Sequence, residues 1–232
     1  PEGQGGAARW YLEEARRLLI EFFTEHNLKA LGVDTRKYGE DYVYEAGLTV
    51  RTAMVPAHQE AAGQALRRGL EELDKRQGWR GPLEQLDADR QRAFAADTAF
   101  APLDLAGGAW TKALVTAVDA KEARVALGKG YSGIIPVANM SWARKPNPKV
   151  AGIYAPAVKD ARLVLSPGDL IWVSAAPRTV TVTNAKGRKE QRSTPFDAAE
   201  VKKGAPIPLL LQQEPAVQGA LASLEPQSGD VV

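Results

Sequence analysis

Apolar residues in the first third of the chain recur with the 3.6-residue period of an α-helix. The pattern predicts a helix from Ala7 to Leu31, with Gly32 as its stop and charged residues on the face opposite the apolar one. The apolar face consists of Tyr11, Ala15, Leu18 and Phe22, at i, i+4, i+7 and i+11. A second helix is predicted from Ala57 to Lys75, directly after Pro56, and a third from Leu83 to Ala96.

After Gly107 and Gly108 the pattern changes to the alternation that is typical of β-strands. Short strands separated by turn residues predict a small antiparallel barrel or sandwich. The predicted strands are Trp110–Val118, Ala123–Leu127, Tyr131–Val137, Leu170–Ser174, Thr179–Thr183, Arg188–Ser193 and Ile207–Leu211. One more strand is expected at Gly47–Met54. The fold class is therefore α+β, in which N-terminal helices and a strand flank an inserted β domain.

Residues 213–232 predict a β-hairpin. One arm precedes the turn Glu225–Gly229, and the second arm begins at Asp230, close to the last position of the sequence. At the other end, Pro1 stands in place of Met and a glycine-rich lead follows it. We therefore expect the chain to be a piece of a longer protein, and its function to be that of a part.

The composition narrows the class of protein only a little. With 232 residues, of which 44% are apolar and 25% charged, the chain is an ordinary globular protein of one large or two small domains. No apolar run approaches the ~20 residues that cross a bilayer, and no signal peptide is present. A net charge of +2 is too small to indicate nucleic-acid binding by itself, and the absence of cysteine excludes disulfides and thiolate metal sites.

No residue pattern predicts a catalytic, metal or cofactor site. Gly128–Gly133 matches G-x-G-x-x-G, but the motif leads into a proline-containing strand where a dinucleotide site needs a helix, so we expect a glycine-rich hairpin. His26 and His58 are the only histidines, and no ligand spacing surrounds them. The serines lack the flanking residues of a nucleophile, and the carboxylates lie among other charges, as on a solvated surface.

The segment Trp142–Lys149 combines an aromatic side chain with several cations. An exposed Trp beside cations on a barrel is typical of single-stranded nucleic-acid binding, but the same Trp would equally cap the barrel core or face a protein partner. A second basic cluster lies at Asn184–Gly187, the predicted turn between the strands Thr179–Thr183 and Arg188–Ser193, and just after it, and is largely balanced by acids. The candidate partner-facing residues are Trp142, Arg144, Lys145, Lys186, Arg188 and Lys189.

Five segments, in this order, resemble the class A penicillin-binding proteins, in particular the 1A type. Gly47–Met54 and the Ala-rich helix after it resemble the link between that family's two enzymatic domains. Asp74–Pro82 is similar to the basic, glycine- and aromatic-containing motif that follows the link. Trp142–Arg144 and Pro167–Val173 resemble the family's OB-like domain, and Leu211–Val231 resembles the entry strand of its transpeptidase domain.

The resemblance implies a division into four segments. Residues 1–35 would be the exit of a glycosyltransferase domain or its linker, and residues 36–100 a linker strand with helices. Residues 101–212 would form the OB-like β domain, and residues 213–232 the truncated entry hairpin of a transpeptidase domain. The first strand and the last hairpin are expected to pair in one sheet.

The family is one of bifunctional, membrane-anchored synthases that polymerise lipid II and cross-link stem peptides through a serine acyl-enzyme. The sequence contains none of Ser-x-x-Lys, Ser-x-Asn and Lys-Thr-Gly, and Glu40–Glu45 only echoes the glycosyltransferase glutamate motif. The resemblance therefore implies a non-catalytic linker and docking module without a cofactor, located in the periplasm and anchored through its parent to the inner membrane.

The partners that the resemblance implies are the rest of the synthase and an outer-membrane lipoprotein activator or other cell-wall proteins, and no nucleic acid. One alternative stays open. A free-standing OB-type module would bind single-stranded nucleic acid or an oligosaccharide, with Trp142 and Arg144 in the binding surface.

Overall fold

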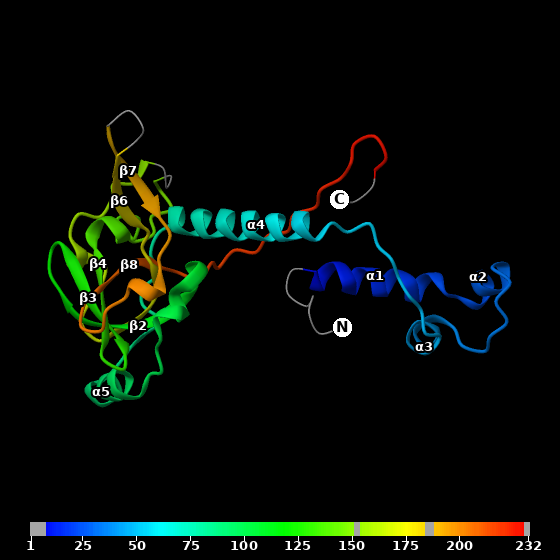
Figure 1. Ribbon diagram of the computed structural model, residues 1–232, viewed down its shortest axis with the longest axis horizontal. Helices are drawn as coiled ribbons and strands as arrows, with labels where there is room; N and C mark the ends of the chain where they lie inside the picture. Colours follow the sequence, from blue (N-terminus) through cyan, green and yellow to red (C-terminus); the bar gives the residue numbers. More distant parts are fainter. Residues whose placement is uncertain (1–7, 151–153, 184–187, 230–232) are drawn as a thin grey trace. The chain divides into compact units, whose positions relative to one another are not determined.

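The computed structural model describes residues 8–150, 154–183 and 188–229 (Figure 1). The chain divides into two compact units, of which the first contains Pro1–Gly69 and Gly219–Val232 and the second Leu70–Gln218. The chain therefore passes from one unit to the other twice. The turn expected at Asn184–Gly187 and the arm expected from Asp230 lie outside the described residues.

Five strands of the second unit close into a barrel, and their bounds match the predicted strands closely (Figure 1). The strands are β2 (Trp110–Val118), β3 (Glu122–Gly128), β4 (Tyr131–Pro136), β5 (Asp169–Ala175) and β8 (Ile207–Gln212). Their order around the barrel is β5-β2-β3-β4-β8, and the pairing of β5 with β8 closes the ring. All neighbours are antiparallel except β4 and β8, which run parallel. This is the connectivity of an OB-type barrel, so the predicted α+β fold with a small OB-like barrel is confirmed.

Alternate side chains of each strand fill the barrel, as a period of two requires. On β5, Ile171 and Val173 are fully buried, and on β8 Leu209 and Leu211 are fully buried. These aliphatic residues form one continuous core with the inward residues of β2, β3 and β4. Burial of each such side chain contributes roughly 1.5–3 kcal/mol. The closed core explains why alternation alone located these strands.

The remaining elements of the second unit lie in two long connections of the barrel and in the chain before it. Between β4 and β5 lie the short helices η2 (Val137–Met140) and η4 (Ala161–Leu163). Between β5 and β8 lie the two-stranded ribbon β6 (Arg178–Thr183) with β7 (Lys189–Thr194), and then η5 (Ala198–Glu200). Before the barrel, β1 (Glu84–Gln85) pairs with β5, α5 (Ala88–Asp97) packs on β2 and β3, and η1 (Pro102–Gly108) leads into β2.

The first unit consists of helices and irregular chain. Its helices are α1 (Arg9–Phe22), α2 (Glu25–Ala30), α3 (Gly39–Glu45) and the first part of α4 (Pro56–Gln77), which continues into the second unit. Helix α1 packs on α3. The ring of Phe23, directly after α1, lies with its centre 4.9 Å from that of Tyr42 on α3. Unlike the barrel strands, α1 has no buried residue.

The structure corrects two of the predicted helices and adds a helix that was not predicted. The helix predicted from Ala7 to Leu31 is interrupted, because Thr24 adopts an extended conformation and its hydroxyl accepts the amide of Asn27, which starts α2 as a new helix. The polar stretch before Gly47 contains the helix α3, which no sequence pattern predicts. The helix predicted from Leu83 begins only after Asp87, whose carboxylate caps α5 by accepting the amides of Asp89 and Arg90.

The strand predicted at Gly47–Met54 is also wrong. In the described structure this segment is irregular and mostly exposed, and it belongs to no sheet. The expected pairing with the last hairpin is absent as far as that hairpin is described, up to Gly229. An alternating pattern stabilises a strand only where a neighbouring strand supplies the hydrogen bonds. The turn at Glu225–Gly229 is present, with the amide of Gly229 donating to the carbonyl of Glu225 at 2.8 Å.

Candidate functional site

The last turn of α4 and the chain that leaves β8 meet in a buried polar network within the second unit. We call it the junction; it consists of Asp74, Gly78, Arg80, Gln213 and Ala216. Asp74 is fully buried, and both of its carboxylate oxygens accept hydrogen bonds. Oδ1 accepts from the guanidinium of Arg80 at 2.7 Å and from the amide of Ala216 at 3.1 Å, and Oδ2 accepts from the side chain of Gln213 at 2.6 Å.

Gln213 connects both sides of the junction with its amide group. Its Oε1 accepts the backbone amide of Arg80 at 2.8 Å, while its Nε2 donates to Asp74 and, at 3.1 Å, to the carbonyl of Gly78. Arg80 also donates to the carbonyl of Glu214 at 2.5 Å. The buried side chains of Asp74 and Gln213 therefore have a hydrogen-bond partner for each of their polar atoms. A network that is satisfied in this way makes the structure around it rigid.

The electrostatics of Asp74 favour its charged form. Burial raises the pKa of Asp74, but hydrogen bonds from Arg80, Gln213 and the amide of Ala216, together with the positive charge of Arg80, outweigh burial and place the pKa below its usual range. The carboxylate is thus ionised at neutral pH and paired with a cation that is itself partly exposed.

Lys75 extends the network from α4 to the barrel wall. Its ammonium group donates to Oε1 of Gln212 at 2.6 Å, and Nε2 of Gln212 donates to the hydroxyl of Ser174 on β5 at 2.7 Å. The same ammonium group lies 5.5 Å from the centre of the Trp142 ring. Burial lowers the pKa of Lys75, against the opposing charges of neighbouring acids.

Two of the sequence-predicted candidates, Trp142 and Arg144, lie against the junction. The half-buried ring of Trp142 packs edge-on against Trp79, with the ring centres 5.8 Å apart. The carbonyl of Arg144 accepts the amide of Trp79 at 2.7 Å, and its guanidinium donates to the carbonyl of Arg76 at 2.5 Å. The next residue, Lys145, is exposed. Trp142 and Arg144 thus make contacts inside the unit, and their role toward a partner stays a prediction.

The other three candidates belong to a different connection of the barrel. Arg188 is exposed and precedes β7, and Lys189 is the first residue of β7. Lys186 lies outside the described residues. The predicted basic surface therefore comes from two connections, β4–β5 and β5–β8, and its role as a partner-facing surface also stays a prediction.

The remaining motifs are accounted for by the fold. Gly128–Gly133 forms the tight connection of β3 to β4, as expected of a hairpin. Gly128 has φ +105°, and a Cβ there would lie 2.3 Å from the carbonyl oxygen of Thr98, so only glycine fits. Among the described residues, no three His, Asp or Glu side chains gather as metal ligands. No helix in the described part combines the length and hydrophobicity needed to cross a bilayer.

Comparison with known proteins identifies the family. Residues 79–217 match the family model of the penicillin-binding protein OB-like domain. The match covers the barrel and ends one residue after Ala216, the last residue of the junction. The chain belongs to this family.

Similar curated proteins include several penicillin-binding proteins 1A. The protein from Rickettsia conorii is 25% identical over 193 residues, which is 83% of this chain and 19% of that protein. The protein from Vibrio cholerae is 33% identical over 148 residues, 62% of this chain and 17% of that protein. This chain thus spans about a fifth of the length of these relatives. A crystal structure of penicillin-binding protein 1A from Haemophilus influenzae aligns with a TM-score of 0.38 and 22% identity, over 81% of this chain and 22% of that one.

Proposed function

We propose that the chain is the non-catalytic linker and OB-like docking module of a bifunctional peptidoglycan synthase. The parent would polymerise lipid II and cross-link stem peptides, and would bind penicillin at its transpeptidase site. The family match and the penicillin-binding proteins 1A among the relatives support this proposal. The module would lie in the periplasm, with the parent anchored in the inner membrane, and a lipoprotein activator or another cell-wall protein would be its partner.

The observation that carries the proposal is the junction. The chain crosses between the two units at Gly69–Leu70 and at Gln218–Gly219, and the junction lies just inside both crossings. Asp74 is on the incoming segment and Ala216 on the outgoing one, and hydrogen bonds to one carboxylate hold them together. A module tied in this way fixes the direction in which the chain enters relative to that in which it leaves.

Fixed entry and exit directions give the module its mechanical role. Each catalytic domain of the synthase would continue from one segment of chain, so the junction would limit the orientations that the two domains adopt. A partner bound to the barrel would then bias the parent only if it prefers one of these orientations. The four-segment division at residues 35, 100 and 212 is part of this proposal.

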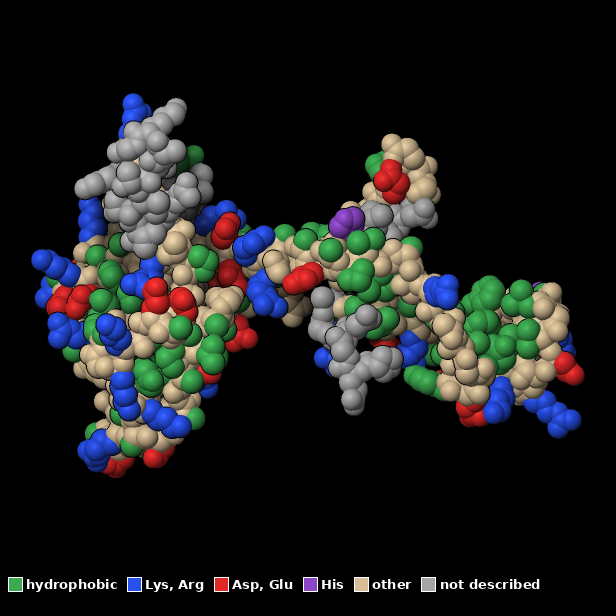
Figure 2. Space-filling model, in the orientation of Figure 1, with side chains coloured by type: hydrophobic (Ala, Val, Ile, Leu, Met, Phe, Trp, Pro, Cys, Tyr) green, Lys and Arg blue, Asp and Glu red, His purple; other side chains and the backbone are tan. Residues whose placement is uncertain are grey.

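The free-standing alternative has less support. On the face shown in Figure 2, Lys and Arg side chains of the barrel unit are interspersed with Asp and Glu side chains, so that no single-sign surface for a phosphate backbone is visible there. Binding of single-stranded DNA or an oligosaccharide that weakens in Trp142→Ala and Arg144→Ala variants with intact folds would favour the alternative.

The test places Asp74→Asn in the synthase that carries the module, with Glu72→Gln as the matched control on the exposed side of the same helix. Asn keeps the shape of Asp but turns an N–H toward a donor and removes the charge that Arg80 pairs with. We expect polymerisation of lipid II and labelling of the transpeptidase by a fluorescent penicillin to persist, while the number of cross-links per glycan strand falls.

Two results would contradict the proposal. Cross-linking that is unchanged in Asp74→Asn, although hydrogen exchange shows that the amide of Ala216 has become unprotected, would separate the junction from coordination of the two sites. Labelling of the isolated 232-residue chain by a fluorescent penicillin would contradict its non-catalytic role.

A further inference from the structure

The ribbon of β6 and β7 leaves the barrel in the β5–β8 connection (Figure 1). Its two strands pair antiparallel over their whole length, in a register without a bulge. In the described part of the chain neither strand pairs with a third one. Each strand therefore has one edge whose backbone N–H and C=O groups meet no neighbouring strand, and such an edge can accept a further strand.

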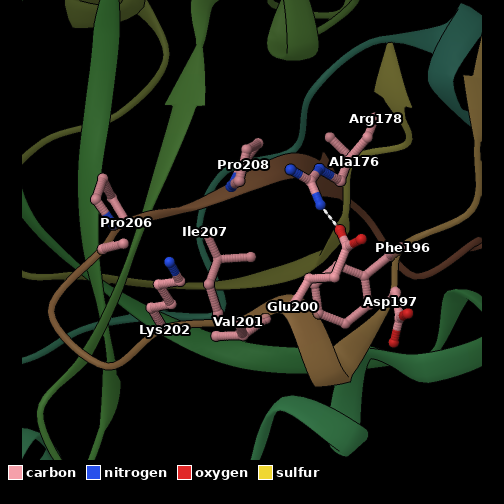
Figure 3. Close-up of a pocket in the computed structure, with 11 residues that line it drawn as sticks. Ala176, Arg178, Phe196, Asp197, Glu200, Val201, Lys202, Pro206, Ile207 and Pro208 are labelled. Atoms are coloured by element: carbon pink, nitrogen blue, oxygen red, sulfur yellow. Dashed lines mark ion pairs between the residues drawn. The ribbon is translucent and has the colours of Figure 1, made fainter. Parts of the chain in front are cut away.

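The base of the ribbon is held by the barrel unit. The amide of Ala176, just before β6, donates to the carbonyl of Pro208 on β8 at 2.9 Å. Arg178, the first residue of β6, forms an ion pair with Glu200 beside the pocket in Figure 3, where the dashed line marks it. The hydroxyl of Thr194, the last residue of β7, donates to the carbonyl of Arg178 at 3.2 Å. The ribbon thus starts from fixed positions, which lowers the ordering cost of pairing it with another strand.

The two edges of the ribbon differ in their protection against pairing. Edge strands of natural proteins avoid unwanted pairing through charged residues, prolines or bulges. Three of the six residues of β7 are charged, namely Lys189, Glu190 and Arg192. In β6 every residue after Arg178 is Thr or Val, and both types favour a strand. The edge of β6 is therefore the one that is open to a further strand.

The sequence of β6 indicates that its partner is a second copy of the same strand. Residues 179–183 read Thr-Val-Thr-Val-Thr, which is the same in both directions. An antiparallel pair with a two-fold axis at Thr181 sets Thr181 opposite itself and Val180 opposite Val182 of the second copy. Residues whose backbone groups face outward alternate along a strand, and this register sets them opposite one another. A patch that contacts itself in this way is the rule in two-fold dimers.

We propose that β6 pairs antiparallel with β6 of a second copy of this chain, about a two-fold axis at Thr181. The two ribbons then form one sheet in the order β7-β6-β6-β7. The charged β7 strands are its outer edges, so the sheet closes at two copies and does not grow. A single pair of strands is a small interface, so the dimer is weak and depends on concentration. In the parent synthase it holds two copies side by side.

The first test uses the absence of cysteine from the sequence. Thr181→Cys places two cysteines opposite each other in the dimer, at a Cα separation of ~4.5–5.5 Å that a disulfide can span. With copper phenanthroline as the oxidant, we expect disulfide-linked dimers to form about tenfold faster than with Gln191→Cys. Gln191→Cys is the matched control, because Gln191 lies opposite Thr181 within the ribbon but on the charged strand.

The register is tested one turn of the pleat away from the axis. In the dimer Thr179 lies opposite Thr183 of the second copy, and about 13 Å from the second Thr179. Thr179→Cys alone should therefore cross-link slowly, and its mixture with Thr183→Cys should cross-link quickly. Cross-linking of Thr179→Cys alone at the rate of Thr181→Cys would indicate parallel strands and overturn the proposed register.

Sedimentation equilibrium tests the same contact without a covalent bond. Thr181→Lys sets two like charges opposite each other and should abolish the dimer, whereas Gln191→Lys should leave it unchanged. The NMR amide signals of the barrel strand β5 show whether either variant has lost its fold.

The proposal is overturned if the chain stays monomeric up to millimolar concentration, if Thr181→Cys cross-links no faster than Gln191→Cys, or if both lysine variants weaken the dimer equally. A monomeric chain whose β6 amides are protected from hydrogen exchange only within the whole synthase would assign this edge to another part of the synthase. The outcome is independent of the connector role, because Asp74 lies in the junction and every readout here belongs to the ribbon.

Discussion

The barrel unit and the helical unit bury their apolar side chains to very different extents. In the barrel, Ile171 and Leu209 are fully buried in one continuous core. In the helical unit, α1 has no buried residue, and Trp10 and Leu18 are 83% and 52% exposed although both lie on a helix that packs on α3. The two units are formed by one chain, yet among the described residues only those of the barrel unit form a buried hydrophobic core.

The difference in burial means that different interactions stabilise the two units. A closed barrel pairs every strand on both sides and excludes water from its interior, so its core residues and its backbone hydrogen bonds support one another. The helices instead rely on local capping, short-range ion pairs and a shallow contact between α1 and α3. Most of the free energy of unfolding should therefore belong to the second unit.

The largest expected effect compares the same substitution in both units. Leu209→Ala removes a fully buried side chain from the barrel and should lower the free energy of unfolding by about 2–5 kcal/mol, because it loses burial and leaves a cavity. Leu18→Ala removes a half-exposed side chain from α1 and should change it by roughly 0.5 kcal/mol or less. Urea denaturation followed by tryptophan fluorescence and by circular dichroism measures both. Equal losses would show that α1 is packed as tightly as the barrel.

A second comparison asks whether the rigidity of the barrel extends to the end of α4. Gly78 and Gly81 share a φ of +106°, but a Cβ on Gly78 would lie 2.7 Å from the carbonyl oxygen of Arg144, whereas nothing lies within 4 Å of one on Gly81. Both Ala variants carry the backbone strain of about 1–2 kcal/mol, and only Gly78→Ala adds a clash worth about 1–3 kcal/mol. A difference in urea midpoint measures the clash alone. If the two variants are equally stable, the end of α4 yields easily and the junction is not rigid.

The barrel strands can be predicted from the sequence because the signals that mark them lie within each strand and the turns beside it. Alternation and turn residues located each of the five barrel strands, and the predicted β6–β7 ribbon is also present. The same alternation failed at Gly47–Met54, where the described structure supplies no partner strand. The break between α1 and α2 was missed because the apolar period continues across Thr24, and only the cap distinguishes two helices from one.

The junction could not be predicted from local pattern. Asp74 follows Glu71 and Glu72 on a charged helix, where a carboxylate normally faces water. Its partners Gln213 and Ala216 come from the chain that leaves β8, 139 and 142 residues later in the sequence. The resemblance to a family motif at Asp74–Pro82 pointed to this segment without giving a role to Asp74. The sequence makes Trp142 and Arg144 candidate partner-facing residues and equally allows Trp142 to cap the core, and the contacts that they make within the unit depend on that same long-range closure.

A third prediction compares the buried carboxylate of the barrel unit with the exposed ones of α1. The pKa of Asp74 is lowered in the folded state, so its contribution to stability is complete above the unfolded value near 4 and is lost as the pH falls through the folded value. At pH 7, Asp74→Asn should therefore lower the free energy of unfolding by about 1–3 kcal/mol, and the gap to the wild type should shrink below about pH 4.

Salt distinguishes the two kinds of carboxylate. Glu13 and Glu14 pair with Arg16 and Arg17 on the exposed surface of α1, and salt screens such pairs. Moderate salt should therefore reduce the effect of Glu14→Gln on helix content and leave that of Asp74→Asn nearly unchanged. Urea titrations at pH 7 and pH 3, each with and without salt, measure this. An effect of Asp74→Asn that is independent of pH would mean that the carboxylate is not ionised in the fold.

The smallest expected effect comes from comparing two side-chain N-caps, one in each unit. Asp87 accepts two amides at the start of α5, at 3.0 and 2.9 Å, and Thr24 accepts one at the start of α2, at 3.3 Å. Asp87→Ala should lower the free energy of unfolding of the barrel by about 1 kcal/mol, because the cap of α5 is lost and α5, which packs on β2 and β3, unfolds together with these strands. Thr24→Ala should leave the barrel transition unchanged and act only on the short helix α2. Hydrogen exchange of the amides of Arg90 and Asn27 separates the two results. If Thr24→Ala also shifts the barrel transition, the helices and the barrel unfold as one cooperative body, and the contrast between the two units lies in burial but not in stability.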